Sequence, residues 1–113
     1  MSTGCAVLAL AACAAIVRPG SAELAAGVRL YETGRLDDAA RFLQRSIDLG
    51  LDEPDQVTAH KYLAFIHCAQ GFEARCGDEF RLVLAIRPSF ELDKAEAGHP
   101  TWGRVFRTVK AGR

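Results

Sequence analysis

The sequence has no excess of charge of one sign and no sustained alternation of the kind that β-strands show. Its 113 residues include 14 Lys and Arg and 14 Asp and Glu, so the formal net charge is +0. A nucleic-acid binder would show a strong basic excess, and that class is therefore excluded. Residues 1–60 hold 5 basic and 8 acidic side chains and residues 61–113 hold 9 and 6, a difference too mild to name a partner. Sustained alternation of apolar and polar residues is absent, so strands are not expected.

A membrane-spanning run is also missing from the sequence. The apolar stretch CAVLALAACAAIV covers residues 5–17, whereas a spanning helix needs about 20 residues. Its length suits the apolar region of a signal peptide. Within it LAAC, residues 10–13, resembles the lipobox of bacterial lipoproteins, in which small residues precede the cysteine that is acylated. The resemblance predicts a signal peptide over residues 1–12, lipidation of Cys13 and a tether over residues 13–21.

The first residues depart from this pattern. MSTG carries no Lys or Arg, although signal peptides begin with positive charge; a start upstream of Met1 would account for the difference. Ala14 follows Cys13, and a residue other than aspartate there implies the outer membrane in such lipoproteins. Several acyl chains on Cys13 would anchor the chain stably to the periplasmic side of that membrane. The alternative is a cytoplasmic protein whose residues 5–17 form an apolar helix packed on the next one.

The remainder of the chain has helical spacing. Apolar residues recur at steps of three and four in four runs, at residues 24–31, 36–47, 62–69 and 80–84. Glycines separate these runs, and Pro54 and Pro88 mark helix ends. Because alanine makes up much of the apolar composition, the helices are expected to pack closely.

The second pair of runs repeats the first. Gly71 follows Gly34 by 37 residues, and at the same offset further positions coincide: Gly27 with Ala64, Ala39 with Cys76, Leu43 with Phe80, Ile47 with Leu84. The pattern resembles the tetratricopeptide repeat, a helix-turn-helix unit of about 34 residues. The resemblance implies an all-α fold of two tetratricopeptide-like hairpins within a domain over residues 22–113. Small residues would lie where helices cross, and Gly34 and Gly71 would form the turns.

Two repeats are few, since about three are usually needed to bury a continuous core. The C-terminal GHPTWGRVFRTVKAGR predicts a short capping helix, with Pro100 in its first turn. Trp102, Val105, Phe106 and Val109 form its apolar stripe. Arg104, Arg107, Lys110 and Arg113 lie largely off that stripe. This basic row is a solvated face, or else it contacts an acidic partner or lipid headgroups, and the alternative to a cap is an exposed binding helix.

HKYLAFIHCAQGFEARC, residues 60–76, holds two of the three histidines and two of the four cysteines. It contains no CxxC motif, which disfavours a redox pair. His60 and His67 lie two turns apart on a helix, too far to chelate one ion, and no zinc signature is present. A Cys/His nucleophile would also need an oxyanion site, which the sequence does not supply. We therefore predict no metal, no cofactor and no catalytic residue.

The remaining hypotheses for the cluster are a disulfide or two buried free thiols. On the repeat, Cys68 lies near the end of one helix and Cys76 faces it from the next, within disulfide range of about 5–6 Å between Cα atoms. Loss of Cys5 with the signal peptide and acylation of Cys13 would leave two thiols to pair, and export would permit the bond. We predict a Cys68–Cys76 disulfide, the alternative being cysteines that act as small hydrophobes.

KYLAFIHC, residues 61–68, the later Cys76 and AEAGHPTWG, residues 95–103, resemble the small TssQ-like lipoproteins associated with bacterial type VI secretion. The resemblance implies an accessory envelope lipoprotein of a secretion apparatus, with no catalytic residues to carry over. We expect protein partners among secretion or envelope components, no nucleic acid and no small-molecule substrate. Its predicted binding surface is the concave face of the first helices, with candidate contacts at Arg29, Glu32, His60 and Lys61. A cytoplasmic tetratricopeptide adaptor or chaperone is the alternative.

Overall fold

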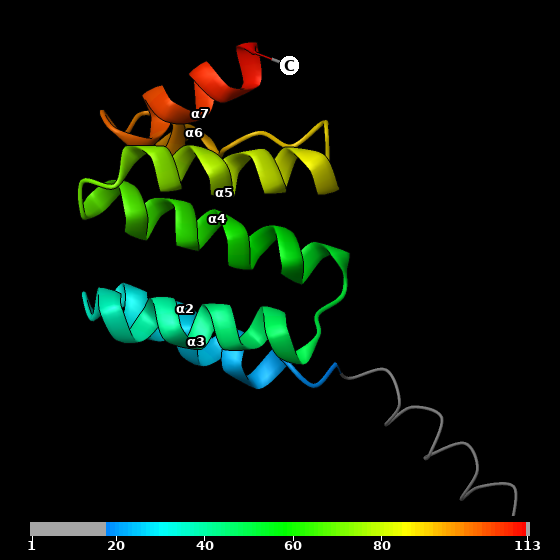
Figure 1. Ribbon diagram of the computed structural model, residues 1–113. Coiled ribbons are helices and arrows are strands. Elements are labelled where there is room, and N and C mark those ends of the chain that lie inside the picture. The colour runs from blue at the N-terminus through cyan, green and yellow to red at the C-terminus, as the bar shows by residue number, and fades with distance from the viewer. Residues whose placement is uncertain (1–17, 113) are drawn as a thin grey trace, which may run out of the picture.

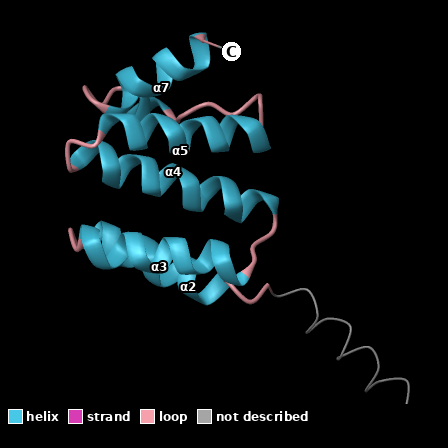
Figure 2. Ribbon diagram, viewed as in Figure 1, coloured by secondary structure: helices cyan, strands magenta, loops and turns pink. Residues whose placement is uncertain are grey.

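All regular elements in the described range, residues 18–112 of the computed structural model, are helices (Figure 2). In chain order they are α2 (Ser21–Glu32), α3 (Leu36–Leu49), α4 (Glu53–Ala69), α5 (Glu73–Ile86), α6 (Lys94–Ala97) and α7 (Trp102–Ala111). The predicted all-α fold with a short C-terminal helix is confirmed.

The helices form a stack of two hairpins with a C-terminal cover (Figure 1). α2 pairs with α3, and α4 pairs with α5. α3 packs on α4, which joins the hairpins, and α7 packs on α5 at the other end of the stack. One buried cluster lies between the first hairpin and α4, with Leu43 and Ile66 fully buried; a second lies between α4, α5 and α7 around Phe80 and Phe106.

Both hairpin turns use glycine in the left-handed region. Gly34 has φ +81° between α2 and α3, and Gly71 has φ +86° between α4 and α5. A side chain at either position would be strained, because a Cβ atom clashes with the backbone in this conformation. The two glycines therefore end the first helix of each hairpin and reverse the chain, as their matching offset in the sequence predicts.

The first hairpin depends on a close helix crossing at Gly27. A Cβ atom placed there would lie 2.8 Å from Cγ of Leu43, which is fully buried on α3. The matching position on α4 is Ala64, also fully buried. Small residues thus lie at both predicted crossing points.

The folded part begins earlier than the predicted boundary at residue 22. Gly20 is buried, and its amide donates to the carbonyl of Gly50 at 3.0 Å. A Cβ at Gly20 would lie 2.2 Å from the carbonyl oxygen of Ser46. The last residues assigned to the tether, Gly20 and Ser21, therefore belong to the helical stack. The predicted signal peptide, Cys5 and Cys13 lie outside the described residues.

The C-terminal cover has two parts, of which the sequence predicted one. α7 buries Val105, Phe106 and Val109 against the stack, which agrees with a capping helix. The placement of Pro100 in its first turn is wrong, because α7 begins at Trp102 with Thr101 as its N-cap. The short α6 was not predicted. Its start is fixed by a capping box between Asp93 and Glu96.

None of the helices within residues 18–112 has the length and apolar character needed to cross a membrane. The longest of them, α4, has 17 residues.

The crossing at Gly27 gives a paired test. Gly27→Ala should destabilise the fold by about 1 kcal/mol or more, because overpacking a closed crossing outweighs the gain in helix propensity. Gly77→Ala should leave stability unchanged or raise it by up to about 1 kcal/mol. At Gly77 the added Cβ would have its nearest neighbours at 3.6 Å. Urea unfolding of both variants measures the two changes in stability. A Gly27→Ala variant as stable as the wild type, or more stable, would contradict the close crossing.

Candidate functional site

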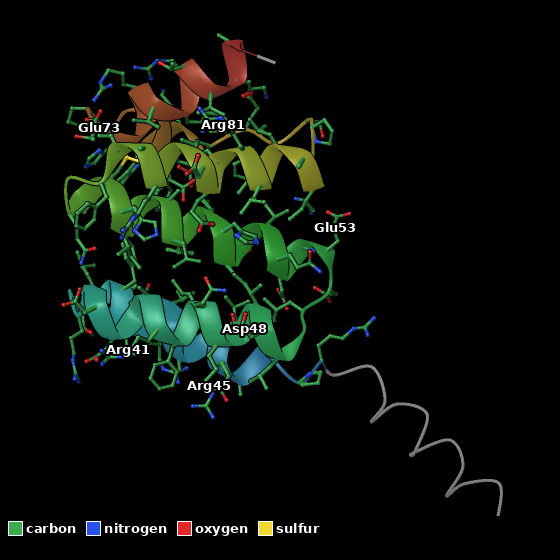
Figure 3. The ribbon with its side chains drawn as sticks, in the orientation of Figure 1. Arg41, Arg45, Asp48, Glu53, Glu73 and Arg81 are labelled. Atoms are coloured by element: carbon green, nitrogen blue, oxygen red, sulfur yellow. A yellow bond between two sulfur atoms is a disulfide. The ribbon has the colours of Figure 1, made fainter. Side chains whose placement is uncertain are left out.

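The two cysteines of the His/Cys cluster are joined at the turn of the second hairpin. Cys68, in the last turn of α4, and Cys76, in the first turn of α5, have Sγ atoms 2.05 Å apart and Cα atoms 5.2 Å apart. Both residues are buried. Figure 3 shows the bond in yellow between the two helices. The predicted pairing is therefore present in the structure, and neither sulfur is available as a free nucleophile.

His60, a predicted partner contact, is engaged within the second hairpin. Its Nδ1 lies 2.6 Å from Oε2 of Glu79 on α5, and both side chains are mostly buried. Its imidazole therefore ties α4 to α5.

His67, one helical heptad further along α4, has no such partner. Its Nδ1 is buried and makes no hydrogen bond within the described residues. Burial lowers the pKa of His67 below its ordinary value, Glu79 raises it in part, and Arg75 lowers it further. The ring is therefore held in its neutral form, which suits a packing role.

Within residues 18–112 no group of His, Cys, Asp and Glu side chains is placed to hold a metal ion. His60 contacts Glu79, and Cys68 and Cys76 are bonded to each other, so none of these three side chains is free to bind a metal ion.

Lys61, the second predicted contact on α4, lies at an aromatic surface. Its Nζ donates to Oε2 of Glu96 on α6 at 2.7 Å and lies 4.9 Å from the ring centroid of Tyr62 and 5.6 Å from that of Phe65. Both members of the ion pair are largely buried. The C-terminal segment thus contacts part of the helix that was predicted to bind a partner.

The aromatic surface extends across three helices and was missed by the sequence analysis. Tyr31 of α2 meets Tyr62 of α4 edge-on with ring centroids 5.0 Å apart, and Phe65 stacks on Trp102 of α7 at 4.3 Å. His99 also stacks on Trp102, with ring centroids 3.4 Å apart. The spacing of Tyr62 and Phe65 on one helical face was the available local signal. Trp102, by contrast, reaches them from far along the chain.

The electrostatics of this surface keep Tyr31 neutral. Burial is the main cause that raises the pKa of Tyr31, and the neighbouring Tyr62 and Glu96 raise it further. Its hydroxyl is therefore a hydrogen-bonding group and not an acid at ordinary pH.

Arg29 and Glu32, the two predicted contacts on α2, are both exposed. Arg29 lines a groove of about 540 Å³ whose walls come from α2, α3 and the turn between them, with Ala26, Leu30 and Phe42 among its lining residues. We call this the hairpin groove. The four predicted contacts are therefore not gathered at one place: His60 and Lys61 are held by Glu79 and Glu96, and Arg29 lies on the groove.

The basic row of α7 is mostly occupied within the chain. Arg104 pairs with Glu73 of α5 at 2.6 Å, and Arg107 donates to the carbonyl of Ala97 at 3.2 Å. Lys110 donates to the carbonyl of Phe90 at 2.7 Å and pairs with Glu91. These contacts favour a structural role for the row, in which exposed ion pairs each contribute about 0–1 kcal/mol.

Removal of the disulfide should lower stability. The double variant Cys68→Ala, Cys76→Ala should lose about 2.6 kcal/mol of unfolding free energy, because its unfolded chain gains the entropy of a loop closed over a separation of 8 residues. Urea unfolding measures this loss. Reducing agent should weaken the wild type to a similar extent and leave the variant unchanged. A wild type insensitive to reduction would count against the bond.

The lowered pKa of His67 predicts a pH dependence. The unfolded chain takes up a proton near pH 6.5, but the folded chain takes it up only at lower pH, so stability falls as the pH drops below about 6.5 until it reaches the folded pKa. His67→Gln should reduce this slope. His60 and His99 are present in both proteins and serve as the internal control. Urea unfolding between about pH 5 and about pH 7.5 measures the slopes, and identical slopes would refute the assignment.

No protein-family model, no curated protein and no solved structure matches this chain. Its function is therefore inferred from its own residues.

Proposed function

We propose that the chain is a membrane-anchored scaffold for protein–protein contact, without enzymatic activity, that belongs to an envelope apparatus. The tetratricopeptide resemblance and the TssQ-like resemblance both favour this function, and the second names type VI secretion. The described helices support the proposal through their two matched hairpins, each with a glycine turn and a small residue at the helix crossing.

The observation that carries the proposal is the pairing of Cys68 with Cys76. Disulfides persist in oxidising compartments and are rare in the cytosol, so the bonded pair favours an exported chain over a cytoplasmic adaptor. Export agrees with the lipobox-like LAAC that ends at Cys13. The disulfide and the lipobox-like motif thus both favour export, and the motif adds the periplasmic side of the outer membrane.

A scaffold is favoured over an enzyme because the reactive groups of the cluster are bonded, hydrogen-bonded or buried. The cysteines are bonded to each other, His60 is paired with Glu79, and His67 is held neutral by burial. Nucleophilic catalysis would need a free thiolate beside a base. The surfaces left for function are those that contact other macromolecules.

Metabolic labelling with an alkyne analogue of palmitate tests the anchor. The wild type and Cys5→Ala should incorporate the label and partition with membranes, whereas Cys13→Ala should lose both, because acylation would occur at Cys13 alone. Cys5→Ala is the matched control, since it changes a second cysteine in the same apolar run. An unlabelled wild type would contradict the lipoprotein hypothesis and favour the cytoplasmic adaptor.

A further inference from the structure

The first hairpin leaves one side uncovered among the described residues. α2 and α3 pack on each other and on α4, and within residues 18–112 no helix covers their opposite side. At the far end of the stack α7 covers α5. The hairpin groove lies on this uncovered side, because it is lined by residues of the first hairpin and by none of α4.

The groove has an apolar floor that extends along α3. Ala26 and Leu30 of α2 and Phe42 of α3 line it. Leu49 is 44% exposed and lies seven residues beyond Phe42, on the same helical side. A hollow between two antiparallel helices, with apolar residues along it, suits the apolar stripe of a third helix.

The rim of the groove is positive. Arg29 and Arg35 line it, and Figure 3 shows Arg41 and Arg45 on the side of α3 that faces away from α4. Asp38 is the one carboxylate among the lining residues, and it is shared by Arg35, at 2.6 Å, and Arg41. Among the lining residues two arginines therefore stand against one carboxylate.

The charges that line the groove between α5 and α7 are balanced. Its volume is about 300 Å³ and its lining includes two acidic and two basic side chains. Each is paired: Glu73 with Arg104 at 2.6 Å, and Asp78 with Arg81 at 2.8 Å. A surface that satisfies its own charges has little electrostatic attraction for a partner, so the unbalanced hairpin groove is the better binding surface.

We propose that the hairpin groove binds an acidic amphipathic helix of a partner protein. The proposal rests on the scaffold function above and names the chemistry of its partner. Apolar residues of that helix, spaced three and four apart, would fill the floor between α2 and α3. Asp and Glu beside them would pair with Arg29 and Arg45.

Other occupants fit the surface less well. A second copy would bring the same arginines against this rim, and like charges repel. Residues 1–17 contain no Asp or Glu and would leave the rim unbalanced. A layer of anionic lipid headgroups would balance the arginines but would not fill the apolar hollow.

Site-specific photocrosslinking tests the proposal with the full chain in its native envelope. p-Benzoylphenylalanine replaces Phe42, and mass spectrometry sequences the crosslinked peptide. The expected adduct is a segment of another protein that has apolar residues at steps of three and four and more Asp and Glu than Lys and Arg. An adduct to a second copy, to residues 1–17 or to lipid, a basic segment, or no adduct at all would overturn the proposal.

Charge reversal supplies the matched control. Arg29→Glu with Arg45→Glu should reduce the crosslink yield by about tenfold or more, because like charges across an interface are strongly unfavourable. Arg81→Glu, at the other end of the stack (Figure 3), should leave the yield unchanged. Equal losses in both variants would overturn the assignment to the groove. Circular dichroism verifies that each variant is folded.

A second crosslinker position separates this proposal from the scaffold function. With p-benzoylphenylalanine at Leu82, exposed on α5, adducts to an envelope protein together with none from position 42 would retain the scaffold and reject the groove. If neither position gave a protein adduct and Cys13 carried no label, the scaffold function itself would fail.

Discussion

The structure depends on α4. Among the described helices it is the only one that packs against the first hairpin, against its own partner α5 and against the C-terminal cover. It contacts α2, α3, α5 and α7, and its buried residues contribute to both hydrophobic clusters: Ile66 to the first and Phe65 to the second. Two hairpins alone bury too little surface to form a continuous core. Burying one helix on all these sides is the way a short stack obtains that core, and the disulfide at the end of α4 fixes the helix to its partner.

The sequence predicted the elements whose causes are local. Gly34 and Gly71 require positive φ, so their equal spacing revealed two hairpins before any contact was known. Cys68 and Cys76 followed from the same register. The ion pair between Lys61 and Glu96 did not, because its partners are 35 residues apart and no periodicity links them. Likewise, Pro100 suits a helix start in general, but here it lies before α7, in the segment that places His99 against Trp102.

The C-terminal segment therefore does more than close the end of the stack. Trp102 stacks on Phe65, and Glu96 accepts from Lys61 while its backbone carbonyl accepts from the Trp102 indole at 2.9 Å. These contacts occupy part of α4 that an open helical repeat would present to a ligand. A chain this short uses that helix face for stability, and the proposed contact with a partner then falls on a surface that the core does not need.

The charge of the groove could not be predicted from the composition of the chain. Residues 1–60 are acidic overall, with 5 basic and 8 acidic side chains, yet the groove in this half is rimmed by arginine. Part of this difference lies outside the first hairpin, because Asp52 is the N-cap of α4 and Glu53 and Asp55 stand in its first turn. The charge around the proposed groove therefore depends on which residues the fold brings together, and the composition of the chain alone does not give it.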